Sequence, residues 1–127
     1  TEDDRQENIR RMAEVSKLFK ECGIILINCF ISPTRQIRDK AKDIIGAHDF
    51  LEVFVNTPIE VCEQRDVKGL YAKARAGIIK NFTGVESPYE PPENPDIEIK
   101  SDEMTVEQAT DALLEKILPK ISLKPTT

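Results

Sequence analysis

The sequence contains a single histidine and three cysteines, and no two cysteines form a CxxC pair. A metal centre of imidazole and thiolate ligands needs a cluster of such residues, so we do not expect one here. Cys22, Cys29 and Cys62 stand in apolar or helical contexts, which favours buried free thiols in a reducing compartment. No apolar run reaches ~18 residues and no signal-peptide pattern opens the sequence, so a cytoplasmic location is the expectation.

The charge of the protein is unevenly distributed along the sequence. The formal net charge is −5, yet the stretch RDVKGLYAKARAG and the three residues after it hold five cations against one acid. A mainly acidic chain is a poor candidate for binding duplex nucleic acid, which is held by many Lys and Arg contacts to phosphates. One basic segment instead suits a small polyanion. We therefore expect a small-molecule ligand, and neither nucleic acid nor a membrane as partner.

Helical and strand patterns alternate along the sequence. The apolar run GIILINCFI predicts a strand buried on both faces, and FLEVFVN predicts a second one. Alternation of this kind predicts a single α/β domain over 1–127, with a parallel sheet flanked by helices. The expected elements are helices over 3–22, 34–45 and 57–65, strands over 24–31, 50–56 and 96–100, a long loop or lid over 77–96, and a capped helix from Thr105 that Pro119 ends.

The segment FISPTR leaves the first expected strand and opens a helix. Ligands of parallel sheets bind beyond the carboxyl ends of the strands, which makes this segment a candidate site. Helix N-terminal amides favour an anion, and Arg35 and Arg38 add two positive charges. Ser32 then either bonds to or reacts with a phosphate, or is only the N-cap of the helix, and the local pattern favours the cap.

The basic segment has two interpretations. Arg and Lys side chains clamp a transferring phosphoryl group in many phosphotransferases, and Lys68, Lys73 and Arg75 are candidates for that role. On spacing alone, a solvated basic helix face is as good an interpretation. The neighbouring lid favours the first one, because mobile covers and cationic hinges occur together in kinases.

Two further stretches carry candidate ligand contacts. Phe82 lies in an otherwise polar loop, where it either stacks on a base or pins the loop to the body of the protein. Arg5 and Asn8 share one helix face, so together they suit a phosphate or sulfate and an adenine edge or ribose. Taken alone, that pair is more simply explained as an ordinary charged first turn.

These stretches together resemble the adenylyl-sulfate kinase family. The resemblance rests on RQENIRRMAEVSKLF, FISP, VFVNTPIEVCEQRDVKGLYAKARAG and IKNFTGVESPYEPPENPDI, in this order over nearly the whole chain. It implies a P-loop kinase fold and transfer of the ATP γ-phosphoryl group to the 3′-hydroxyl of adenylyl sulfate, giving 3′-phosphoadenylyl sulfate in sulfate assimilation. It further implies ATP as co-substrate with Mg²⁺, a homodimer, and fusion to or association with ATP sulfurylase in part of the family.

The resemblance also assigns roles to residues by position. Ser32 matches the serine described as a phosphoserine intermediate in bacterial members. The family often has glycine where Asn81 stands, and this departure affects the bend of the loop. The implied adenylyl sulfate contacts are Arg5, Asn8, Ile31, Lys68, Asn81 and Phe82, with Lys68 also catalytic; Arg65 and Met104 border ATP; and Arg35, Lys73 and Arg75 supply positive charge to phosphate and sulfate.

The family's phosphate-binding loop, GxxxxGK[ST], has no counterpart in this sequence. That loop holds the ATP phosphates and its Ser/Thr holds Mg²⁺. We therefore expect that the sequence begins inside the domain and that the chain alone is inactive. Two alternatives stay open: another small-molecule P-loop kinase, or a non-catalytic fragment that only binds nucleotide.

Overall fold

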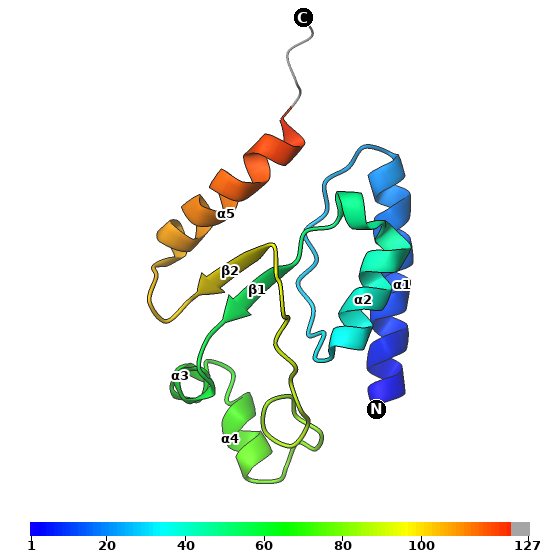
Figure 1. Cartoon of the computed structure of the whole chain (residues 1–127). Coiled ribbons are helices and arrows are strands. Elements are labelled where there is room, and N and C mark those ends of the chain that lie inside the picture. Colours follow the sequence, from blue (N-terminus) through cyan, green and yellow to red (C-terminus); the bar gives the residue numbers. More distant parts are fainter. Residues whose placement is uncertain (123–127) are drawn as a thin grey trace, which may run out of the picture. The chain divides into compact units, whose positions relative to one another are not determined.

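A computed structural model describes residues 1–122, which divide into two compact units (Figure 1). The first unit comprises Thr1–Phe50 and Asp66–Glu93, and the second comprises Leu51–Arg65 and the segment that starts at Asn94. A single domain over 1–127 stays a prediction.

The first unit is built around two helices, α1 (Glu2–Glu21) and α2 (Arg35–Ile45), which lie side by side (Figure 1). Both confirm the predicted helices to within one residue at each end. A capping box between Thr1 and Asp4 starts α1, and Gly46 follows α2. The remaining elements of the unit are a 3₁₀ turn, η1 (Ala47–Asp49), and the short helix α4 (Leu70–Arg75), and its buried core consists of Ile9, Ala13, Ser16, Pro33, Ile37 and Ala74.

The predicted strand over 24–31 is wrong, because this segment forms neither helix nor strand. Most of its side chains are exposed rather than buried, with Ile27 at 88% and Ile31 at 67% exposure. A strand needs a neighbour to accept and donate its backbone hydrogen bonds, and none of the described residues pairs with this run. The prediction of buried thiols is also wrong at Cys22 and Cys29, which are exposed, while Cys62 is half-buried.

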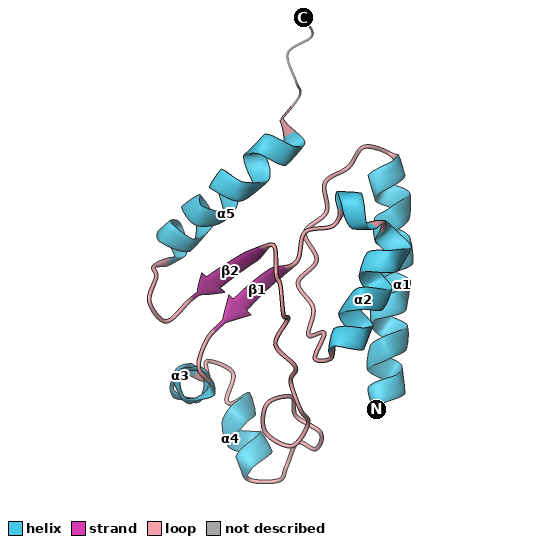
Figure 2. Ribbon diagram, in the orientation of Figure 1, coloured by secondary structure: helices cyan, strands magenta, loops and turns pink. Residues whose placement is uncertain are grey.

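The second unit contains the sheet, which has two strands among the described residues (Figure 2). β1 (Val53–Asn56) and β2 (Ile97–Lys100) are parallel and in register from Val53 opposite Ile97 to Asn56 opposite Lys100. Both strands and their parallel direction confirm the predicted α/β class. Ile97 and Ile99 form the buried face of β2. The prediction of a strand over 50–56 that is buried on both faces is wrong, because β1 begins at Val53 and both Val53 and Val55 are exposed.

Two helices complete the second unit, α3 (Ile59–Arg65) and α5 (Val106–Ile121). The predicted capping box of Thr105 and Gln108 is confirmed at the start of α5. The prediction that Pro119 ends this helix is wrong, since α5 continues to Ile121. Pro119 lies in the last turn, where its missing N–H removes one helical hydrogen bond, and the Ser122 amide beyond it still bonds to the Leu118 carbonyl at 2.9 Å. None of the described helices is long and apolar enough to cross a membrane.

Candidate functional site

The turn around Ser32 leads into α2, but Ser32 is not its N-cap. The Thr34 hydroxyl caps the helix by accepting from the Ile37 amide at 3.4 Å, so the prediction of Ser32 as the cap is wrong. The Ser32 carbonyl instead accepts a hydrogen bond from the Arg38 guanidinium at 2.7 Å. The phosphoserine role of Ser32 stays a prediction.

A carboxylate of the chain itself occupies the N-terminus of α2. The Arg35 amide donates to the Glu90 carboxylate at 2.8 Å, which meets the preference of a helix N-terminus for an anion. The Arg35 side chain donates to the Pro91 carbonyl at 3.0 Å and pairs with Glu93 at 2.8 Å. The expected role of Arg35 toward phosphate or sulfate therefore stays a prediction, and it would require release of these contacts.

Asp66, the one acid of the basic segment, organises the helix that follows it. Its carboxylate accepts from the backbone amides of Tyr71 and Ala72, each at 3.0 Å. The bond from the Ala72 amide is the largest cause of a lowered pKa for Asp66, and the nearby charge of Lys73 acts in the same direction. Gly69 adopts a left-handed conformation, φ 64°, immediately before α4. Asp66 and Gly69 thus set where the basic helix α4 begins.

Three cations of this segment lie at the surface of the protein. Lys68, Lys73 and Arg75 are all exposed. Within the part of the chain that the structure describes, Lys68 forms no hydrogen bond or ion pair. An uncommitted ammonium group beside a helix start suits a bound anion, although the predicted roles of Lys68, Lys73 and Arg75 remain untested.

Phe82 sits in a compact loop that two neighbouring elements hold in place. The Arg5 guanidinium, from α1, donates to the Asn81 carbonyl. The Phe82 ring packs edge-to-face on Tyr71 of α4, with ring centroids 5.1 Å apart, and Phe82 stays half-buried. The loop closes on itself through a bridge between Thr83 and Ser87.

Asn81 explains how this loop tolerates a residue other than glycine. Its φ is 55°, in the left-handed region that asparagine adopts more readily than most other residues. The Asn81 amide donates to the Glu86 carboxylate at 2.6 Å, which holds this conformation. Asparagine thus provides the backbone bend that glycine would give.

The structure brings together only part of the predicted site. Arg5, Asn81 and Phe82 meet in the first unit, which also contains Asn8 and Ile31, both exposed at the surface. The two residues expected near ATP lie in the second unit. Arg65 donates to the Ser101 carbonyl at 2.9 Å, and Met104 is 40% exposed.

Sequence reasoning named Arg38 only as a positive charge for an anion at the start of α2, and it missed Glu90 and Tyr71. Arg38 and Glu90 bridge segments 52 residues apart, and Tyr71 supports Phe82. The only sequence signals of Glu90 and Tyr71 are a tyrosine–glutamate pair within a proline-rich loop and an aromatic residue beside the basic stretch. Neither signal says which distant segment such side chains contact.

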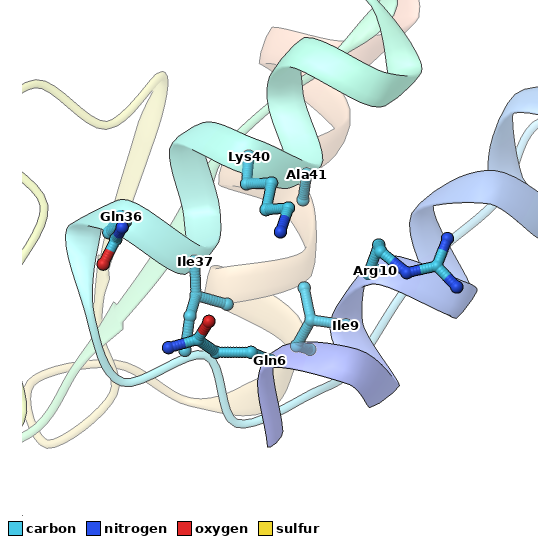
Figure 3. Close-up of a pocket in the computed structure, with 7 residues that line it drawn as sticks. All are labelled: Gln6, Ile9, Arg10, Gln36, Ile37, Lys40 and Ala41. Carbon is cyan, nitrogen blue, oxygen red and sulfur yellow. The ribbon is translucent and has the colours of Figure 1, made fainter. Parts of the chain in front are cut away.

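A small cavity between α1 and α2 does not hold the ligand (Figure 3). Its volume is about 30 Å³, which suits water rather than a nucleotide, whose pockets are about ten or more times larger. Figure 3 shows the polar side chain of Gln6 beside the apolar Ile9 and Ile37, with Gln36 farther to the left on α2. Among residues 1–122 no group of three or more His, Cys, Asp or Glu side chains is placed to hold a metal ion.

Comparisons with solved structures identify the class of fold. The chain is similar to the APS kinase of Mycobacterium tuberculosis, solved in complex with AMPPNP and APS, with 43% identity and a TM-score of 0.84. The match covers 92% of this chain and 68% of that one. The fold is therefore that of the α/β kinases with a P-loop fold.

Comparisons of sequence identify the family. The profile described as Adenylylsulphate kinase matches residues 1–100, so the chain belongs to the adenylyl-sulfate kinase family. A curated relative from Bacteroides thetaiotaomicron, named adenylyl-sulfate kinase, is 58% identical over 98% of this chain and 62% of its own length. One from Halothermothrix orenii, with the same name, is 56% identical over 91% of this chain and 61% of its own length. The chain thus spans about three fifths of the length of these relatives.

Proposed function

We propose that this chain supplies the acceptor-binding part of a kinase that transfers the γ-phosphoryl group of ATP to the 3′-hydroxyl of adenylyl sulfate. The observation that carries the proposal is the 58% identity, over 98% of the chain, to a relative named adenylyl-sulfate kinase. The similar solved structure contains APS and AMPPNP, a non-hydrolysed ATP analogue, which are the acceptor and donor that the proposal needs.

The geometry of the first unit supports a nucleotide acceptor. The aromatic ring of Phe82 is only half-buried and could stack on a base, and the exposed Lys68 offers a positive charge to a phosphate or sulfate. Phosphoryl transfer depends on positioning and on charge stabilisation rather than on covalent chemistry. A rigid loop and a solvated cation meet these two needs.

The remaining expectations rest on the family resemblance. When bound with ATP, Mg²⁺ would neutralise phosphate charge, and the resemblance implies that its ligands belong to the family's phosphate-binding loop. A homodimer, an association with ATP sulfurylase, a cytoplasmic location and a role in sulfate assimilation stay predictions of the same kind.

An acceptor panel tests the proposed function. ADP formation from ATP would be measured with the complete polypeptide that carries this chain, with adenylyl sulfate, shikimate, a hexose or no acceptor. The proposal predicts ADP formation that requires adenylyl sulfate. Equal rates with every acceptor, or a rate that needs shikimate or the hexose instead, would refute it.

A further inference from the structure

The segment that follows the Phe82 loop is fastened to the start of α2 by a set of direct contacts. The Arg38 guanidinium donates to the Ser32 carbonyl at 2.7 Å and to the Glu90 carbonyl at 2.6 Å. Its central carbon lies 5.7 Å from the centroid of the Tyr89 ring, in a cation–π arrangement. One half-buried side chain therefore joins two segments that are more than 50 residues apart in sequence.

Glu90 strengthens the same junction from the other side. Its amide donates to the Pro33 carbonyl at 2.7 Å, and its carboxylate accepts from the Arg35 amide at 2.8 Å. Pro33 is fully buried, so the turn that receives these bonds is a fixed part of the unit. We call Arg38 and Glu90, with their bonds to Ser32 and Pro33, the clamp.

The clamp lies between the two segments that are expected to contact adenylyl sulfate. On one side, the bond to the Ser32 carbonyl fixes the residue directly after Ile31. On the other side, only Pro88 and Tyr89 separate Glu90 from Ser87, which closes the Phe82 loop. The proline restricts the backbone of this short connection, so an anchor at Glu90 transmits its position to the loop.

The opposite end of the loop has its own anchor. Arg5 donates to the Asn81 carbonyl at the start of the loop, so the loop is held by one arginine at each end. Both anchors belong to the first unit. A loop fixed at both ends keeps the Phe82 ring in one place before a ligand arrives, which reduces the ordering cost of binding.

We propose that Arg38 is a positioning residue of the adenylyl sulfate site: by clamping the Ser32 turn to Glu90, it sets the distance between Ile31 and the Phe82 loop. The proposal rests on the proposed function. Arg38 itself acts through backbone carbonyls and does not contact the reacting groups. Its removal should weaken acceptor binding and leave the ATP side of the reaction unaffected.

The test compares Arg38→Ala with Arg11→Ala in the complete polypeptide. Arg11 is a matched control, because its side chain is 72% exposed and, among the described residues, pairs only locally, with Glu7 one turn earlier on α1. The KM for adenylyl sulfate, the KM for ATP and the kcat are measured for each variant. For Arg38→Ala we expect the KM for adenylyl sulfate to rise about 10- to 100-fold while the KM for ATP stays within about twofold, as expected when a binding group moves by about 1 Å.

Chemical rescue separates positioning from a general loss of structure. Added guanidinium ion at millimolar concentration can reoccupy the space left by Arg38→Ala and bridge the two carbonyls again. It should lower the KM for adenylyl sulfate in Arg38→Ala and have no effect on Arg11→Ala. If Arg38→Ala does not fold, Arg38→Lys replaces it, since its ammonium group lacks the planar fork that reaches both carbonyls, and the same rise in KM is then required.

Each outcome decides between the two proposals. A wild-type protein with no adenylyl-sulfate-dependent ADP formation would refute the proposed function and this inference with it. An active wild-type protein with unchanged KM values in the Arg38 variant would refute the inference alone. An equal rise of both KM values, without rescue by guanidinium, would also refute it, because that pattern indicates a global defect.

Discussion

The two units of the chain differ in the balance between regular backbone hydrogen bonds and side-chain hydrogen bonds to irregular segments. In the second unit, the β1–β2 ladder is a regular array of backbone hydrogen bonds, and a capping box starts α5. In the first unit, charged side chains bond to backbone groups of irregular segments, as Arg38 and Asp66 do. Regular backbone hydrogen bonds form helices and strands, which short sequence patterns specify. Side-chain hydrogen bonds instead hold irregular loops, and the candidate ligand-binding residues lie on such loops. The difference between the units can be tested by substitutions in each.

The largest effect is expected in the core of the second unit. Ile99 is 4% exposed on β2, and Ile99→Ala should lower the free energy of unfolding by about 2–5 kcal/mol, because it removes buried methyl groups and leaves a cavity. Denaturant unfolding of the complete polypeptide measures this change. Val106→Ala is the control, since Val106 is 79% exposed. Equal losses for both variants would show that β2 is not a core strand.

A smaller effect, on binding rather than on stability, is expected in the first unit. Phe82→Ala should weaken adenylyl sulfate binding by about 1–3 kcal/mol if its ring stacks on the base. Calorimetric titration gives this value, with Phe19→Ala as the control, because Phe19 is an exposed phenylalanine on α1. Unchanged affinity in Phe82→Ala would remove this ring from the binding site.

The cap of α5 should contribute less than the core of its unit. Thr105→Ala removes the hydroxyl that accepts from the Gln108 amide at 3.2 Å, and should cost about 0.5–2 kcal/mol of unfolding free energy. Thr105→Ser keeps an oxygen acceptor and should recover most of that loss. Identical stabilities for the alanine and serine variants would contradict the capping role.

The smallest effect is a pH dependence in the first unit. The hydrogen bonds from Ala72 and Tyr71 lower the pKa of Asp66 below its ordinary value of 3.8. The ionised carboxylate therefore stabilises the folded chain above pH 3.8, and this contribution is lost as the pH falls through the lowered pKa.

The comparison of wild type with Asp66→Asn measures that dependence. The difference in unfolding free energy between the two proteins should be greatest near neutral pH and should shrink below pH 3.8. A difference that is constant from neutral to acidic pH would show that the charge of Asp66 plays no part.

Local sequence patterns predicted most of the helices and strands, but they did not predict the contacts between distant segments of the first unit. The cap of α5 and the apolar alternation of β2 depend on residues that are close together in sequence. Both elements could therefore be predicted from the sequence. The run over 24–31 has an equally strong strand pattern, yet it has no strand partner among the described residues. Strand formation depends on a neighbour as well as on the run itself.

The candidate site shows the same division. The family resemblance pointed to Arg5, Asn81 and Phe82, and the structure places these three together. The resemblance could not indicate that Arg38 and Glu90 hold the loop. The hydrogen-bond partners of such side chains depend on which distant segments the fold brings together. The sequence also placed Ser32 at the helix cap, where the neighbouring Thr34 had equal capping chemistry.

The most direct test of the central claim, that the first unit carries the adenylyl sulfate site, is hydrogen–deuterium exchange of the complete polypeptide with and without adenylyl sulfate. The account predicts slower exchange at amides of residues 31–32, 68–75 and 81–87, all in the first unit. Slower exchange confined to β1, α3, β2 and α5, or no change at any amide, would contradict it.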